Sequence, residues 1–245
     1  MERNIKLLIS YDGTSYHGWQ MQENAITVQQ VLTEAAERIT SQKVSINGCS
    51  RTDAGVHANS FCCNFRTDSD VDSRTLLRGI NALLPDDVAV LSVEDMDIDF
   101  HARFDCKGKE YIYKIWNSKV KNPFLKDKAL HYPYLLDAEL MNEQAKYFIG
   151  THDFSSFCAA GSTVKDNVRT VFDCGVRREG DLVTFYVKGD GFLYNMVRIM
   201  VGTLLYINSG KIEKNTVTDI IESRDRLRAG ITAKSHGLYL NEVYY

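Results

Sequence analysis

Residues 44–65 read VSINGCSRTDAGVHANSFCCNF and contain two strand-like runs joined by a loop of small residues. Residues 44–47 predict a short strand, and residues 56–65, which are rich in apolar and aromatic side chains, predict a longer one. In the loop between them, Gly48 and Gly55 allow the backbone to approach a ligand closely. The elements on both sides of this stretch then define the first half of the chain.

The flanking segments complete a strand–helix–strand–strand–helix–strand order. Residues 4–11 predict a strand, and Thr27 begins a Thr-x-x-Gln capping box ahead of apolar residues at helical spacing. On the other side, Ser73 is predicted to cap a helix that Pro85 closes. Residues 88–94 predict the last strand of this half.

The second half of the chain repeats the order. Its predicted elements are a strand at 107–117, a helix capped by Asp137, a hairpin of 168–178 and 182–189, helices at 193–207 and 214–222, and a closing strand from 237. Each half therefore matches the split βαββαβ unit of ferredoxin-like folds. We expect an α+β fold in which two such halves, 1–104 and 105–245, share one continuous, mostly antiparallel sheet with a central cleft.

The composition is that of an ordinary globular protein. The chain has 245 residues, of which 44% are hydrophobic and 25% charged, and this excludes disordered, collagenous and disulfide-rich classes. No apolar run approaches the roughly 18 residues that span a bilayer, and the opening segment lacks a secretory signal pattern. We expect a soluble cytoplasmic protein without membrane association.

Cysteine and histidine spacing predicts neither disulfides nor a metal site. The six cysteines include no Cys-x-x-Cys pair, and the six histidines include no His-x-x-x-His pair. Zinc sites need such spacings. We therefore expect free buried thiols and no metal.

Charge is distributed unevenly along the chain, although its net value is only −3. Residues 68–100 hold nine acids against two bases, whereas residues 101–128 hold eight bases against three acids. A basic run of this kind is either a solvated face or a local surface for phosphate contact.

Asp53 lies in the loop of small residues, two positions after Arg51. A single carboxylate in such a loop suits a nucleophile or a general base. The alternative is a tight turn in which Asp53 caps neighbouring backbone amides. The pattern Arg-Thr-Asp-Ala-Gly leaves both interpretations open.

Arg198 is the only charged residue between Phe192 and Ile207. A helix that is apolar nearly all round is buried, so we expect Arg198 to be buried and to need a partner. That partner is either a structural acid or a catalytic carboxylate held in a bidentate pair. Gly202, one turn further on, leaves room for another chain or a substrate to approach.

Tyr111, Tyr113 and Ile115 alternate on one face of the strand at 107–117. An aromatic ring on a sheet beside basic residues can stack on a flipped base. Alternating aromatic side chains in a strand are also typical of a core.

A set of short motifs in a fixed order extends from residue 11 to residue 240. They are Tyr11-Asp12-Gly13-Thr14, Gly18-Trp19-Gln20, Arg51-Thr52-Asp53-Ala54-Gly55-Val56-His57, His101-Ala102-Arg103-Phe104, Lys109-x-Tyr111-x-Tyr113, Gly150-x-His152-Asp153-Phe154, Met196-Val197-Arg198 with Gly202, and Gly237-Leu238-Tyr239-Leu240. In this order they resemble the tRNA pseudouridine synthase A (TruA) family.

The resemblance implies a cofactor-free isomerase. It would convert uridines to pseudouridine in the anticodon stem-loop of tRNA, at tRNA positions 38 to 40, and act as a homodimer with tRNA across both subunits. The roles that the resemblance implies are the nucleophile for Asp53, its partner for Arg198, substrate contact for Tyr111, base flipping for Arg51 and the base pocket for Leu238.

One segment departs from the family pattern. Family members commonly carry prolines before Gly-Leu-Tyr, whereas this chain has Ala233-Lys234-Ser235-His236, which makes the shape of that loop an open question. The alternatives to the TruA assignment are a pseudouridine synthase with other RNA targets and a non-catalytic RNA-binding protein. A nucleoside hydrolase or glycosidase normally needs a second carboxylate, and none is adjacent to Asp53 in the sequence.

Overall fold

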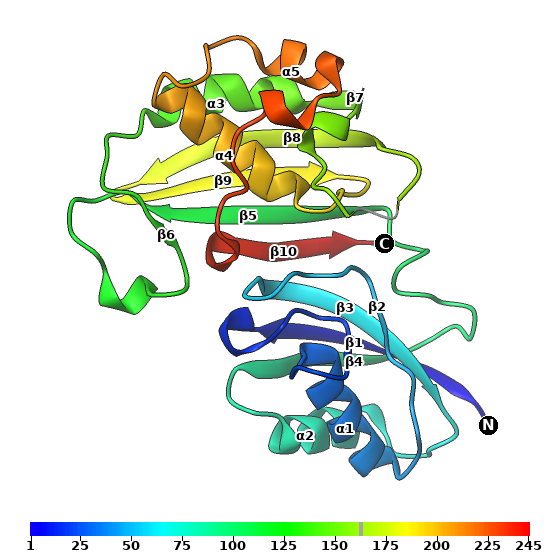
Figure 1. Cartoon of the computed structure of the whole chain (residues 1–245). Coiled ribbons are helices and arrows are strands. Elements are labelled where there is room, and N and C mark those ends of the chain that lie inside the picture. Colours follow the sequence, from blue (N-terminus) through cyan, green and yellow to red (C-terminus); the bar gives the residue numbers. More distant parts are fainter. Residues whose placement is uncertain (162–163) are drawn as a thin grey trace. The chain divides into compact units, whose positions relative to one another are not determined.

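The computed structural model describes residues 1–161 and 164–245, which form two compact units (Figure 1). Unit 1 comprises Met1–Lys107 together with Tyr239–Tyr245, and unit 2 comprises Gly108–Leu238. Helices and mostly antiparallel strands occur together in each unit, so the predicted α+β class is confirmed. The units differ from the predicted halves, because the first unit continues to Lys107 instead of residue 104 and the closing strand groups with it.

Unit 1 is a sheet in the order β4-β1-β3, with both pairings antiparallel. Its elements are β1 (Arg3–Tyr11), α1 (Val28–Thr40), β2 (Asn47–Gly48), β3 (His57–Thr67), α2 (Ser73–Leu83), β4 (Val88–Met96) and β10 (Leu238–Tyr244). The far edge of β3 pairs with two strands, with β2 at Cys63 and Asn64 and in parallel with β10 at His57 and Ala58. The order β4-β1-β3-β2 is that of the predicted split unit.

Local hydrogen bonds explain where the two helices of unit 1 begin. Thr27 accepts a hydrogen bond from the amide of Gln30, as its position in the capping box predicts. The second helix differs from the prediction. Asp72, and not Ser73, is its N-cap, because the Asp72 carboxylate accepts from the amides of Arg74 and Thr75. A carboxylate reaches two amides, whereas the Ser73 hydroxyl donates to Asp95.

Both helices cover the same face of the unit 1 sheet (Figure 1). The strand β1 turns Ile5, Leu7 and Ile9 to the interior, and all three are fully buried. Leu32 of α1 and Ile80 of α2 are also fully buried. The period-2 pattern of the strand and the period-3.6 pattern of the helices thus supply the two sides of one core.

Unit 2 is built on a sheet in the order β5-β9-β8-β7, again antiparallel. Its elements are β5 (Gly108–Trp116), β6 (Leu130–His131), α3 (Ala138–Ala145), β7 (Gly150–Asp153), β8 (Val168–Glu179), β9 (Leu182–Gly189), α4 (Met196–Asn208) and α5 (Val217–Ser223). Short 3-10 turns occur in both units, at Gly13–Ser15, Pro123–Leu125, Lys146–Phe148, Ser155–Phe157, Arg226–Arg228 and Ser235–Gly237. The predicted hairpin is confirmed, since β8 and β9 are joined by the two-residue turn at Gly180 and Asp181.

The helix α3 packs along β8 and protects part of its edge. The Asn142 side-chain oxygen accepts a hydrogen bond of 3.0 Å from the Val176 amide, and the Lys146 ammonium donates one of 2.6 Å to the Cys174 carbonyl. Backbone groups that β7 does not reach are therefore paired with side chains, which limits pairing with another strand.

Gly202 of α4 allows another segment of unit 2 to cross the helix closely. A Cβ atom at Gly202 would lie 1.7 Å from the carbonyl oxygen of Ile231, and a Cβ at Gly230 would lie 2.4 Å from the Gly202 backbone. The room predicted beside Gly202 is therefore filled by this chain itself, at residues 230 and 231.

All six cysteines are free. Cys49, Cys62, Cys63 and Cys174 are buried as predicted, whereas Cys106 and Cys158 are half-buried. Over the described part of the chain, no helix has the length and apolar character needed to cross a bilayer.

Candidate active site

The loop that carries Asp53 connects β2 to β3 and is held by residues from the start of the chain. The Tyr11 hydroxyl lies 2.8 Å from the Thr52 hydroxyl, and both side chains are buried. The Trp19 amide donates to the Thr52 carbonyl at 3.1 Å, and the Gly55 amide donates to the Tyr16 carbonyl at 3.2 Å. These three contacts fix the residues on both sides of Asp53.

The turn at Asp53 is closed by main-chain groups. The Val56 amide donates to the Asp53 carbonyl at 3.1 Å, and Gly55 has a φ of 75°, which favours glycine. The backbone at Gly18 lies so close to this loop that only glycine fits there, because a Cβ at Gly18 would lie 2.3 Å from the Thr52 carbonyl oxygen. The Asp53 side chain is half-buried, and Arg51, on the same loop, is exposed.

His57, at the start of β3, organises the base of this loop. Its ring is buried, with Nδ1 3.0 Å from an Asp12 carboxylate oxygen and 3.1 Å from the Gly13 amide, which donates to it. The ring stacks on Tyr239 with 4.6 Å between ring centroids. No role for His57 was predicted from the sequence, although it lies in the same motif as Asp53. The only sequence signal was that motif, since the partner Asp12 is far away along the chain.

In unit 2, the alternating face of β5 is part of the core. Tyr113 and Ile115 are fully buried, and the Tyr113 hydroxyl donates to the Lys234 carbonyl at 2.7 Å. Tyr111 is also buried and meets Phe192 edge-on, with 5.1 Å between ring centroids. The core interpretation therefore holds for Tyr113 and Ile115, and Tyr111 lies beside the segment that leads into α4.

Arg198, in the first turn of α4, is half-buried, so the expectation that it is buried is wrong. Its Nε donates to the Ala233 carbonyl at 2.7 Å, and its Nη1 donates to the Asn195 side-chain oxygen at 2.5 Å. In return, the Ala233 amide donates to the Arg198 carbonyl at 3.1 Å. Asn195 has a φ of 60°, a left-handed conformation that asparagine tolerates. Neutral oxygens of unit 2 thus orient this guanidinium.

The segment that lacks the family's prolines is held by hydrogen bonds and packing. Ser235–Gly237 forms a 3-10 turn, and a Cβ at Gly237 would lie 2.6 Å from the Tyr113 ring. Burial, followed by the nearby charge of Lys234, lowers the pKa of His236. Leu238, which comes next, is buried. Tertiary contacts therefore fix the conformation of this loop, although it lacks the prolines that would restrict its backbone torsions.

Comparison with known proteins identifies the family. A sequence profile described as tRNA pseudouridine synthase matches residues 7–105 and 144–245. The chain belongs to this tRNA pseudouridine synthase family. The predicted enzyme class, an isomerase that forms pseudouridine in tRNA, is thereby confirmed.

Relatives of this family match along their whole length. The tRNA pseudouridine synthase A of Acetivibrio thermocellus is 49% identical over 99% of this chain and 100% of the relative. Those of Thermoanaerobacter sp. and Clostridium acetobutylicum are each 45% identical over the same shares. Among solved structures, a chain of a Cbf5-Nop10-Gar1 complex aligns with 82% of this chain and 44% of its own length, with a TM-score of 0.35 and 17% identity. That likeness is too remote to bear on the fold.

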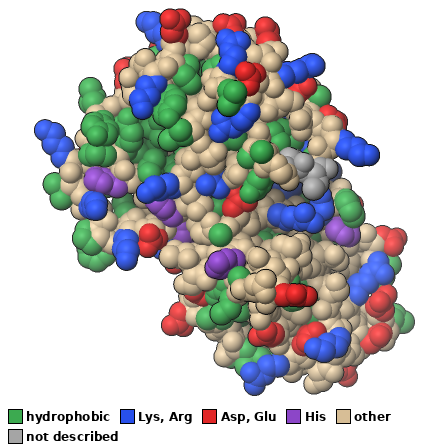
Figure 2. Space-filling model, in the orientation of Figure 1, with side chains coloured by type: hydrophobic (Ala, Val, Ile, Leu, Met, Phe, Trp, Pro, Cys, Tyr) green, Lys and Arg blue, Asp and Glu red, His purple; other side chains and the backbone are tan. Residues whose placement is uncertain are grey.

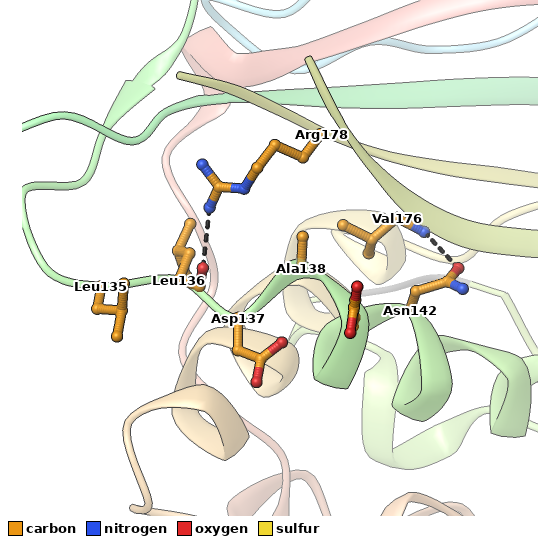
Figure 3. A pocket seen from close by; sticks show the side chains of 8 residues that line it. Leu135, Leu136, Asp137, Ala138, Asn142, Val176 and Arg178 are labelled. Carbon is orange, nitrogen blue, oxygen red and sulfur yellow. Dashed lines mark hydrogen bonds between the residues drawn. The ribbon is translucent and has the colours of Figure 1, made fainter. Parts of the chain in front are cut away.

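The predicted site residues of this pseudouridine synthase are divided between the units. Asp53 and Arg51 share the loop of unit 1, whereas Tyr111, Arg198 and Leu238 belong to unit 2. Within residues 1–161 and 164–245, no three His, Cys, Asp or Glu side chains form a group that could hold a metal ion. The cavity in Figure 3, at the start of α3, is lined by none of the five predicted residues.

Proposed function

We propose that this chain isomerises uridines in the anticodon stem-loop of tRNA, at positions 38 to 40, with Asp53 as the reacting carboxylate and Arg198 as its partner. The observation that carries the proposal is the loop itself. It holds Asp53 on a turn that main-chain groups close, within a motif that matches the family's catalytic segment. The full-length match to proteins named tRNA pseudouridine synthase A supports the substrate class.

The reaction sets the requirements for the site. The bond between ribose C1′ and uracil N1 breaks, the base turns, and a new bond joins C1′ to C5. The hydrogen on C5 is released as a proton, and N1 gains one, so no oxidant or reductant is needed. A base inside a stem must first leave the stack, which costs a few kcal/mol.

In this proposal, Asp53 acts at the sugar. Its carboxylate either attacks C1′ to form a covalent adduct or assists removal of the 2′ proton, and these two routes remain alternatives. Arg198 pairs with Asp53 and orients it, since a guanidinium binds a carboxylate through two parallel hydrogen bonds. The contacts of Arg198 with Asn195 and Ala233 support this role, because they restrict the guanidinium before substrate binds.

The other predicted residues handle the base. Tyr111 is proposed to hold the everted uracil by stacking, and Leu238 to line its pocket. Arg51 is proposed to fill the space that the base leaves and to contact phosphate, which suits its exposed position on the loop. The resemblance also supports a homodimer with tRNA across both subunits, which we include in the proposal.

The decisive test is Asp53→Asn, measured by tritium release from tRNA labelled at uridine C5. We expect no pseudouridine formation and nearly unchanged tRNA affinity, because the amide keeps the shape of the side chain but not its reactivity. Lys43→Ala is a control, since Lys43 is exposed and pairs with Glu37. Turnover by Asp53→Asn near the wild-type rate would refute the assignment and favour a non-catalytic RNA-binding protein.

A second test addresses Arg198. Arg198→Lys keeps the charge but loses the planar fork of donors, so we expect kcat to fall with little change in KM. Wild-type kcat in this variant would show that Arg198 is only structural. Mapping of modified positions in tRNA from a deletion strain distinguishes positions 38 to 40 from other RNA targets.

A further inference from the structure

One short segment of unit 2 holds the guanidinium of Arg198. We name this segment, residues 230–233, the strap. It follows the 3-10 turn at Arg226–Arg228 and crosses α4 (Figure 1). At its end, the Ala233 carbonyl accepts from Arg198 Nε at 2.7 Å, and the Ala233 amide donates to the Arg198 carbonyl at 3.1 Å. The conformation of the strap therefore decides where this guanidinium lies.

Close packing fixes the middle of the strap on α4. The Gly230 amide donates to the Thr203 hydroxyl at 2.9 Å, and that hydroxyl donates to the Ile199 carbonyl at 2.8 Å. Thr203 is fully buried. Beside it, no side chain fits at Gly202, because the Ile231 carbonyl lies there. The strap is therefore held at one place along the helix.

A side chain holds each end of the strap. Directly after its last residue, the Lys234 carbonyl accepts from the Tyr113 hydroxyl at 2.7 Å. At its start, Arg226 donates from Nη1 to the Gly230 carbonyl at 2.8 Å and from Nη2 to the Thr232 hydroxyl at 3.3 Å. One planar guanidinium thus bridges two points of the strap, which suits arginine and not lysine.

The turn that carries Arg226 is itself fixed to the rest of unit 2. Just before it, Arg224 pairs with Asp153, with 3.0 Å between Nε and a carboxylate oxygen. The turn packs against the neighbouring 3-10 turn, in which the Ser156 hydroxyl donates to the Ile220 carbonyl of α5 at 2.6 Å. Arg226 therefore joins a fixed support to the strap.

Arg226 differs from the solvated cations of this chain. Figure 2 shows lysine and arginine side chains that extend from the surface of both units, whereas Arg226 is half-buried. Burial lowers its pKa, but a guanidinium stays protonated near neutral pH. A charged group that gives up water needs hydrogen bonds in return. The two oxygens of the strap supply them.

We propose that Arg226 is a positioning residue for pseudouridine formation, because it fixes the strap that holds Arg198. The inference rests on the proposed function, in which Arg198 orients the reacting carboxylate. A small displacement of such a group slows a reaction strongly even when its cause is remote. An arginine on a turn also suits an RNA phosphate, but both terminal nitrogens of Arg226 already donate within the chain.

The first test is Arg226→Met, which removes the donors and keeps the apolar part of the side chain. We expect kcat to fall about tenfold or more with little change in the KM for tRNA. Arg226→Lys should restore only part of this loss, since an ammonium lacks the planar fork. Arg228→Met is the matched control and should react like the wild type, because Arg228 is exposed and donates to the Asp219 carbonyl of α5. A raised KM with unchanged kcat in Arg226→Met would overturn the proposal in favour of an RNA contact.

The second test observes Arg198 without relying on catalysis. In the whole chain labelled with ¹⁵N-arginine, NMR measures how fast the Arg198 Nε proton exchanges with water. Loss of a hydrogen bond to a charged group should speed this exchange about tenfold or more in Arg226→Met, and Arg228→Met should leave it unchanged. Exchange at the wild-type rate in Arg226→Met would overturn the proposal. Thr232→Val, which removes one acceptor of Arg226, should give smaller changes in the same direction and tests the proposal if Arg226→Met does not fold.

A double substitution shows whether Arg226 acts through Arg198. In the Arg198→Lys background, Arg226→Met should lower kcat by no more than about twofold further, whereas independent effects would multiply. A full further loss would make Arg226 a merely structural residue and overturn the inference.

Failure of the inference can be told apart from failure of the proposed function. Wild-type kcat in Arg226→Met, where Arg198→Lys is impaired, would refute the inference alone. Wild-type kcat in Arg198→Lys would refute the catalytic role of Arg198 and the inference with it. Neither result would change the assignment of Asp53, which tritium release by Asp53→Asn tests.

Discussion

Thiols show how a single residue's surroundings determine its chemistry. Burial raises the pKa of the Cys62 thiol to about 11, and it raises the pKa of Cys63 and of Cys174 well above the ordinary value. A thiol reacts as its thiolate. These three cysteines are therefore protonated and inert near neutral pH.

Alkylation with iodoacetamide at pH 7.5, read by peptide mass spectrometry, tests this expectation. Cys106 and Cys158, which are half-buried, should be modified first. Cys62, Cys63 and Cys174 should react only after denaturation in urea, where all six thiols should react alike. Modification of Cys63 in the native protein at the rate of Cys106 would contradict the burial described here.

His57 shows what a residue gains from tertiary contacts. The sequence places it in the motif of Asp53, but its partners Asp12 and Tyr239 come from opposite ends of the chain. An isolated histidine has no such partners, so its role in supporting the loop could not be predicted from the sequence.

At the scale of elements, the N-cap of α2 gives a simple test of the structure, because two neighbouring residues are candidates for it. The first turn of α2 differs from the sequence prediction by one residue, since Asp72 caps the helix in place of Ser73. The hydrogen bond that the Thr75 hydroxyl donates to the Asp72 carboxylate is the largest cause that lowers the pKa of Asp72. The carboxylate is therefore charged at neutral pH and suited to the positive end of the helix.

Asp72→Ala should reduce the free energy of unfolding by about 1 kcal/mol, the usual loss for an N-cap. Ser73→Ala should change it by less than about 0.5 kcal/mol, since the half-buried Ser73 hydroxyl donates to the side chain of Asp95 and does not cap the helix. Urea denaturation followed by circular dichroism measures both. Equal losses from the two substitutions would contradict the assignment of Asp72 as the cap.

Two helical glycines provide a matched pair. Gly202→Ala places a Cβ against the Ile231 backbone, which cannot move without shifting the segment. Gly79→Ala, in α2, meets only the flexible end of Ile39 at 2.8 Å. We expect Gly202→Ala to destabilise by about 1–3 kcal/mol or more and Gly79→Ala to change stability by less than about 1 kcal/mol. Thermal unfolding of both variants measures this difference. Equal melting temperatures would refute the close crossing at Gly202.

At the scale of the whole molecule, charge distribution matters more than net charge. A chain of net charge −3 binds an anionic polymer only through local basic surfaces. Arg103 and Lys107 are exposed members of the basic run at 101–128. They are the side chains that we expect to contact the RNA backbone.

The logarithm of the association constant for tRNA should therefore fall linearly with the logarithm of the salt concentration. The double substitution Arg103→Ala and Lys107→Ala should make the slope shallower by about 1 to 2. Fluorescence anisotropy at several salt concentrations measures the slope, with Lys43→Ala as the control. A slope unchanged by the double substitution would place the RNA contacts elsewhere.

Much of the fold followed from local patterns. Alternation along β1 and helical spacing after Thr27 depend only on neighbouring residues, so the order of elements and the approximate ends of the main helices and strands were predictable. The hairpin at Gly180 was predictable for the same reason, because a left-handed φ there favours glycine. The motifs around Asp53 and Arg198 are short runs of consecutive residues, so they could be recognised in the sequence, and they indicated the family.

The sequence by itself thus determined the order of elements, the family and the candidate reacting residues. Only the tertiary structure decided which groups hold them, as with Thr52 held by Tyr11 and Trp19, or Arg198 held by Ala233. It also decided that the closing strand pairs with β3 and that Phe124 faces solvent. The reason is physical, because periodicity reports on a residue's neighbours in the chain. Hydrogen bonds and burial instead depend on segments that meet only after folding.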